Sequence, residues 1–236
     1  MTVAAVILAA SVERALADTL GQPRVRRLVD IAWAGGAMPV VVVSPDPDGQ
    51  VARAIAETEA IWGEPAPPEA GPAGQMVRGC ELAAAAVRDT TAVLLWPARM
   101  VWVGAETATS LIEAHGTDPG SLLRPSWNGT PGWPTLVPFV HLDQLRIVGA
   151  GHGPDEAIDV VAGSVPSRTI ELGDPGVVFD ADTPESELPP YEGPSVPAGG
   201  HVHEWGDDVE SLADATGEGR SLAPRPQALP GGPTDR

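Results

Sequence analysis

The sequence predicts one α/β domain with a largely parallel sheet, followed by an acidic, proline-rich tail. Short apolar runs alternate with segments of helical periodicity, and this is the pattern of strands that helices cover on both faces. After about residue 190 the composition changes to Pro, Gly, Ser, Asp and Glu with few apolar residues, a mixture that cannot offset its ordering entropy. We therefore expect a domain over residues 1–190 and a mostly disordered tail over residues 191–236.

The first half of the domain has the order of a βαβ unit. Residues 3–9 form a nearly unbroken apolar run, which predicts a central strand. Helical spacing then extends from Leu20 to the pair Gly35 and Gly36, which is well suited to ending a helix, and a second buried strand follows over residues 38–43. The elements expected next are a helix over 50–58, a strand over 60–62, a surface loop over 64–72, an alanine-rich helix over 74–88 and a strand over 92–95.

The second half shows shorter elements. We expect helices over 107–115, 142–147 and 155–161, and short strands over 121–123, 135–137, 169–172 and 177–179. The three long apolar runs, at 3–9, 38–43 and 92–95, are expected to be adjacent and parallel. In open sheets of this kind, ligands bind beyond the carboxyl ends of the strands. The candidate site is therefore formed by the loops that follow Ala9, Val43 and Leu95.

Charge and composition exclude several classes of function. The formal net charge of -18 repels phosphate backbones and anionic lipid, so we expect no nucleic acid and no membrane as partner. The apolar run at residues 3–9 is far shorter than a membrane span, and Cys80 has no second cysteine with which to form a disulfide. These features favour a cytoplasmic location. The fourteen basic residues are all arginines, which excludes a lysine clamp or Schiff base.

Four stretches carry a family pattern. Residues 7–11 (ILAAS) are similar to an opening LAAG, and residues 74–79 (GQMVRG) to a GxxxSLxxG segment. Residues 132–136 (GWPTL) are similar to GHPxxF, and residues 176–185 (GVVFDADTPE) to a closing GxxxDIDTPED. Together they resemble the molybdenum-cofactor nucleotidyltransferases, the MobA/MocA-like family of NTP transferases. The resemblance implies a Rossmann-like three-layer α/β/α fold and magnesium-dependent transfer of a nucleotidyl group from CTP or GTP to a phosphorylated acceptor.

The chain departs from this family at the positions that would contact the phosphates and the metal ion. The family loop LAAGxSxRxGxxK supplies a glycine and a lysine to the phosphates, and residues 11–17 (SVERALA) have neither. At residues 94–99 (LLWPAR), Pro97 stands where the family pattern LLGDxP has its metal-binding aspartate. The sequence therefore resembles a nucleotidyltransferase in its scaffold and not in the electrostatics of its site.

The resemblance also implies which residues form the site. Arg14 and Arg99 are the candidate phosphate contacts, and Mg²⁺, needed only by an active protein, would be held by Asp180 or Asp182. The expected nucleotide-binding residues are Leu8, Ala9, Ala10, Ser11, Arg14, Gly74 and Arg78.

Each of these residues has a plainer interpretation. The two aspartates are expected to hold a turn before a last helix, with Thr183 as its N-cap and Pro184 at its first position. The arginines could instead form surface ion pairs with neighbouring acids. Four tryptophans near the expected crevice could form an aromatic platform for a flat ligand or could fill the core; they are Trp96, Trp102, Trp127 and Trp133.

Two functions remain open from the sequence. The first is a catalytically degenerate relative that keeps the fold to bind a nucleotide, a pterin-like ligand or a protein. The second is an active, divergent nucleotidyltransferase. The loss of glycine, lysine and aspartate favours the degenerate relative, because each stabilises the charge-rich transition state of the family.

The tail contains one amphipathic segment. Trp205, Val209 and Leu212 fall at i, i+4 and i+7, on one face of a short helix. A helix of this length is marginal in water unless its apolar face is covered. We therefore expect it to dock either on the parent domain or on a protein partner, with permanent disorder as the alternative.

Overall fold

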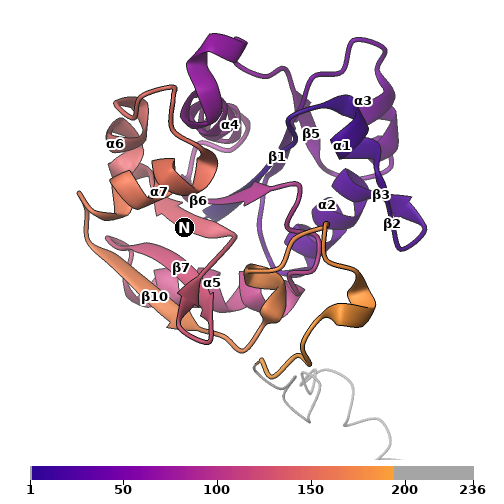
Figure 1. The fold of residues 1–236 in the computed structure, drawn as a ribbon. Coiled ribbons are helices and arrows are strands. Elements are labelled where there is room, and N and C mark those ends of the chain that lie inside the picture. The colour runs from indigo at the N-terminus through magenta and orange to yellow at the C-terminus, as the bar shows by residue number, and fades with distance from the viewer. Residues whose placement is uncertain (1, 194–236) are drawn as a thin grey trace, which may run out of the picture. The chain divides into compact units, whose positions relative to one another are not determined.

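The computed structural model describes residues 2–193, and its centre is an eight-stranded, mostly parallel sheet (Figure 1). Its strands are β1 (Thr2–Leu8), β4 (Val40–Val43), β5 (Ile61–Gly63), β6 (Thr90–Pro97), β7 (Leu122–Trp127), β8 (Thr130–Pro131), β9 (Thr135–Pro138) and β10 (Ser167–Glu171). The strand order is β10-β7-β9-β6-β1-β4-β5, with β8 paired to β7. β1 is parallel to both of its neighbours, β4 and β6, which confirms the prediction for the three apolar runs. β9 runs antiparallel to β6 and β7.

Helices cover both faces of this sheet. They are α1 (Val12–Leu16), α2 (Arg24–Ala34), α3 (Gln50–Ile55), α4 (Gly71–Ala86), α5 (Ala105–Thr117), α6 (Leu142–Arg146) and α7 (Pro154–Ala162). On one face, α4 packs against β1, β4 and β6 and also contacts α6 and α7 (Figure 1). On the other face α2 packs against β1 and β4 and contacts α5. The predicted three-layer α/β/α fold is therefore confirmed.

The remaining elements are short. β2 (Asp18–Thr19) and β3 (Gln22–Pro23) form a separate two-stranded hairpin between α1 and α2. Single 3-10 turns occur at η1 (Pro68–Ala70), η2 (Phe139–His141), η3 (Pro175–Val177) and η4 (Glu185–Glu187). Within residues 2–193, no helix combines the length and the apolar character needed to cross a membrane.

The unbroken apolar runs form the centre of the core. The side chains of Val6 in β1 and Val41 in β4 are fully buried, as expected for strands covered on both faces. α4 lies close to β1 because Gly79 faces this strand, and a Cβ atom at that position would collide with the side chain of Val6. Gly79 therefore sets how closely α4 approaches the sheet.

Two predicted elements near residue 180 are wrong. Residues 177–179 do not form a strand, because the buried carboxylate of Asp174 accepts a hydrogen bond from Gly176 N (2.8 Å) and caps the 3-10 turn η3 instead. Thr183 does not cap an α-helix. Pro184 precedes only the three-residue turn η4, and its extended backbone is incompatible with a helix that begins at that position.

One backbone hydrogen bond lies close to the boundary predicted between the domain and the tail. Glu192 N donates to Gly173 O (2.9 Å), so residues just past 190 still contact the domain. The helical segment predicted around Trp205, Val209 and Leu212 lies outside the described residues.

His115 gives the fold a dependence on pH. This side chain of α5 is buried, neither ring nitrogen has a hydrogen-bond partner, and burial lowers its pKa from 6.5 while the charge of Asp118 acts the other way. The unfolded chain therefore binds more protons than the folded one as the pH falls below 6.5. The free energy of unfolding is expected to decrease over this range.

Urea unfolding at about pH 7.5 and about pH 5.5 measures this effect. In His115→Leu the loss of stability between the two pH values should be smaller than in the unchanged protein. His152→Ala is the control, because His152 is exposed and its ring only contacts Gly149 O. An undiminished loss in His115→Leu would contradict the assignment to His115.

Candidate functional site

A cavity of about 480 Å³ lies at the carboxyl ends of β1, β4 and β6. This is the edge at which open α/β sheets bind their ligands, and it is the position predicted from the sequence. The cavity is bounded by Leu8, Ala9, Ala10, Arg14, Arg24, Val43, Pro45, Pro65, Ala66, Pro68, Gly71, Pro72, Gln75, Met76, Pro97, Ala98, Arg99 and Pro154. Its walls are mainly apolar, and its charged side chains are three arginines.

Most of the predicted nucleotide-binding residues meet at this cavity. Leu8, Ala9, Ala10 and Arg14 line it directly. Ser11 has a structural role instead, because its hydroxyl accepts a hydrogen bond from Arg14 N (3.2 Å) and caps α1. The serine therefore positions the short helix that carries Arg14.

Gly74 and Arg78 lie outside the main cavity. Both line a smaller neighbouring hollow, together with Glu64 and Glu81. Arg78 Nε donates to Glu64 O (3.1 Å), which fixes the guanidinium against the loop before α4. Of the arginines predicted from the sequence, the structure brings Arg14 and Arg99 to the cavity and leaves Arg78 beside it.

Arg24 lines the cavity and was missed by the sequence analysis. It is the first residue of α2, and its Nε is buried without a hydrogen-bond partner. Burial lowers the pKa of Arg24, and the neighbouring charge of Arg14 adds to this, while the carboxylates of Asp182 and Asp180 raise it. A guanidinium in this position has an unused donor beside a cavity. The one signal in the sequence was an arginine among apolar residues at helical spacing.

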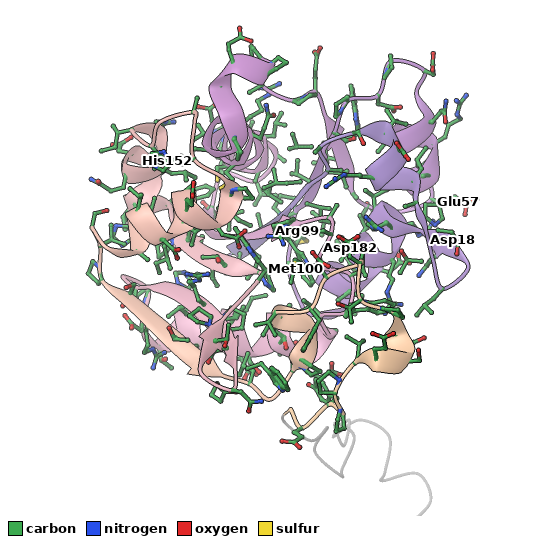
Figure 2. All side chains as sticks on the ribbon, viewed as in Figure 1. Asp18, Glu57, Arg99, Met100, His152 and Asp182 are labelled. Atoms are coloured by element: carbon green, nitrogen blue, oxygen red, sulfur yellow. The ribbon has the colours of Figure 1, made fainter. Side chains whose placement is uncertain are left out.

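Arg99 is held from two sides by carboxylates. Its Nη2 donates to Asp155 Oδ2 (2.8 Å), and its Nη1 lies 3.7 Å from Asp180 Oδ2. Asp155, in the first turn of α7, also accepts a hydrogen bond from Trp133 Nε1 (2.7 Å). Figure 2 shows Arg99 and Asp182 near the middle of the view. The two segments that carry them are joined by a backbone hydrogen bond, which Ala181 N donates to Arg99 O (2.8 Å). Arg99 is thus oriented before any ligand arrives.

The residues at this cavity do not fit a divalent metal. Pro97 ends β6 at the cavity wall, where the resemblance implies a carboxylate, and no acidic side chain lines the cavity. Asp180 already contacts Arg99, and its Oδ1 accepts a hydrogen bond from Asp182 N (3.0 Å). Across residues 2–193, no three His, Cys, Asp or Glu side chains gather as metal ligands. Mg²⁺ prefers several oxygen ligands, and the neighbouring arginines oppose its binding.

The four tryptophans do not form a platform in the cavity, since none of them lines it. Trp96 and Trp133 are buried in the core. Trp102 Nε1 donates to the carbonyl oxygens of Asp180 (2.9 Å) and Thr183 (3.0 Å). Trp127 packs edge-on against Phe179. The tryptophans therefore support the segments around the site and leave ligand contact to other residues.

A mostly parallel α/β/α sheet with its cavity beyond the ends of β1, β4 and β6 defines the class of open α/β domains that bind a ligand at the strand ends. Within this class, residues 6–162 match the model of the MobA-like NTP transferase domain. The chain belongs to this family.

Solved structures show the same fold at low sequence identity. Rv0371C from Mycobacterium tuberculosis H37Rv, in complex with manganese, has a TM-score of 0.58 and is 16% identical, covering 73% of this chain and 89% of that chain. The 4-diphosphocytidyl-2C-methyl-D-erythritol synthase from Anaerococcus prevotii has a TM-score of 0.60 and is 8% identical, covering 78% and 92%. CMP:2-keto-3-deoxy-manno-octonic acid synthetase complexed with CTP has a TM-score of 0.55 and is 13% identical, covering 73% and 90%. No curated protein matches the chain by sequence.

Proposed function

We propose that this protein is a non-catalytic member of the nucleotidyltransferase family, of the molybdenum-cofactor type, that binds a phosphorylated ligand in the cavity. The observation that carries the proposal is Pro97 at the end of β6, in a cavity whose charged lining residues are all arginines. Metal-assisted nucleotidyl transfer needs carboxylates to hold the ion that bridges the phosphates. The cavity offers cations for an anion and no such carboxylates.

The cavity is suited to binding a phosphate group without catalysing its transfer. Arg14, Arg24 and Arg99 come from three different segments and converge on one space. Guanidinium groups bind phosphate oxygens through charge-assisted and often bidentate hydrogen bonds. A nucleotide or a phosphorylated pterin-like molecule satisfies this requirement, and a cytoplasmic location would give access to both.

An active, divergent nucleotidyltransferase is the second candidate. It is favoured by the negative charges of Asp180 and Asp182, which act on Arg24, a residue that lines the cavity. In this alternative one of these aspartates holds Mg²⁺ and the arginines replace the lysine of the family. Asp180 would then have to exchange its contact with Arg99 for the metal.

The two candidates differ in turnover. We expect no measurable release of pyrophosphate from CTP or GTP, with molybdopterin as acceptor and with either Mg²⁺ or Mn²⁺. Pyrophosphate itself, added without metal, should raise the melting temperature, because a ligand of the folded state stabilises it. Trp96→Gly combined with Pro97→Asp should not restore turnover, since the phosphate loop still lacks its glycine and lysine. Turnover that Asp182→Ala abolishes would establish the active alternative instead.

A further inference from the structure

One cavity wall, formed by the loop after β5 and the first two residues of α4, has no free backbone N–H group; it is called the loop wall. The residues of this loop wall are Pro65, Ala66, Pro68, Gly71 and Pro72. The three prolines carry no N–H. Ala66 N donates to Gln75 Oε1 (2.8 Å), and Gly71 N donates to Pro68 O. Each backbone donor on the loop wall is therefore either missing or already bonded.

Gln75 is the neutral polar side chain among the lining residues, and it is largely occupied. Its Oε1 accepts from Ala66 N and its Nε2 donates to Ala66 O, both at 2.8 Å. This reciprocal pair fixes the loop wall against α4. One amide hydrogen of Gln75 remains as the side-chain donor that this side of the cavity can offer to a ligand.

The rest of the cavity combines apolar surface with cations. Leu8, Val43 and Met76 add apolar side chains, and Pro45, Pro97 and Pro154 add three further residues without an N–H group. Three guanidinium groups supply the charge, and Arg24 Nε has no hydrogen-bond partner. The cavity therefore matches a molecule with an anionic end and an apolar body.

We infer that the cavity binds a phosphate or diphosphate ester of an apolar group, with arginines at the anionic end and the proline-rich loop wall around the body. The inference rests on the proposed function, because it takes this cavity as the ligand site. Cytosine and guanine present carbonyl oxygens that need hydrogen-bond donors. Burying a base against the loop wall, where one amide hydrogen of Gln75 is the free donor, leaves the other acceptors of the base unpaired, which is costly, whereas an apolar body gains by being buried there.

Calorimetric titration of the full-length chain with four diphosphates, without metal and at one fixed salt concentration, tests the inference. The probes are inorganic pyrophosphate, geranyl diphosphate, CDP and GDP. Geranyl diphosphate should bind at least about tenfold more tightly than pyrophosphate, since burial of apolar surface adds affinity. CDP and GDP should bind at most about threefold more tightly than pyrophosphate, because the loop wall offers their bases no donor besides one amide hydrogen of Gln75.

The outcomes separate the inference from the proposed function. If CDP or GDP binds more tightly than geranyl diphosphate, or if all four bind equally, the inference is overturned while the proposed function stands. If none of the four binds, the proposed function fails and the inference fails with it.

Two substitutions on the cavity wall make the test local. Leu8→Gln and Pro65→Ser each place a polar group against the expected apolar body, because both residues line the cavity and are partly exposed, so the advantage of geranyl diphosphate over pyrophosphate should fall at least about threefold. Pro67→Ser is the matched control, because Pro67 lies on the same loop but lines only the smaller hollow. Retained pyrophosphate binding shows that each variant is folded. An unchanged advantage in both wall variants would contradict the inference.

Discussion

Asp174→Ala is expected to lower the free energy of unfolding by about 3 kcal/mol, since hydrogen bonds to a charged acceptor are each worth more than neutral ones. The carboxylate is buried and accepts three hydrogen bonds, from Gly104 N (3.0 Å), Thr107 Oγ1 (2.7 Å) and Gly176 N (2.8 Å). It thereby ties the start of α5 to the turn η3. Removing it leaves three donors without their acceptor in a region closed to water. Urea unfolding of the two proteins at neutral pH measures the loss.

The effect of Asp174→Ala should also depend on pH. Desolvation raises the pKa of Asp174 above 3.8, although its three hydrogen bonds act in the opposite direction. The folded protein therefore binds more protons than the unfolded one just above pH 3.8, and the stability contributed by this residue falls as the pH rises through that window. The substitution should cost more at about pH 4 than at about pH 7. Asp174→Asn retains the shape of the side chain and should cost less than Asp174→Ala, and an equal cost would argue against the hydrogen bonds as the cause.

The central sheet could be predicted from the sequence because burial on both faces leaves an unambiguous pattern. Residues 3–9, 38–43 and 92–95 are continuous apolar runs, and each became a strand of the parallel core. The region around residue 180 could not be predicted in the same way. Its conformation depends on Asp174, whose partners Gly104 and Thr107 lie about 70 positions earlier. Local apolar composition carries no information about such a contact.

The site could be predicted only in part, for a similar reason. Arg14 and Arg99 follow strands that end at the cavity, so the rule for parallel sheets located them. Arg24 follows no strand of the central sheet, and only the hairpin of β2 and β3 brings the start of α2 to the cavity. The occupied donors of the loop wall depend on the contact of Gln75 with Ala66, nine positions apart. Apart from the position of Arg24 among apolar residues at helical spacing, neither feature has a local sequence signature.

Arg24→Met is expected to weaken the binding of inorganic pyrophosphate at least about tenfold, the typical value of one charge-assisted hydrogen bond lost. Arg24 has a buried Nε without a hydrogen-bond partner, whereas Arg99 is held by Asp155 and Asp180. A ligand phosphate in the cavity would meet the guanidinium of Arg24 as one of the three cations that line it. Methionine preserves the length and the apolar stem of the side chain, so the packing of α2 should be retained.

Arg26→Met is the matched control for Arg24→Met, because Arg26 lies on the same helix and pairs with Asp30 at i,i+4 (3.1 Å) away from the cavity. It changes the net charge of the chain by the same amount. Calorimetric titration with pyrophosphate at two salt concentrations distinguishes a contact from a general field, since salt screens the field more strongly. A tenfold loss confined to Arg24→Met would assign the contact to Arg24. Equal small losses in both variants would reduce Arg24 to one part of the background charge, leaving Arg14 and Arg99 to bind the phosphate.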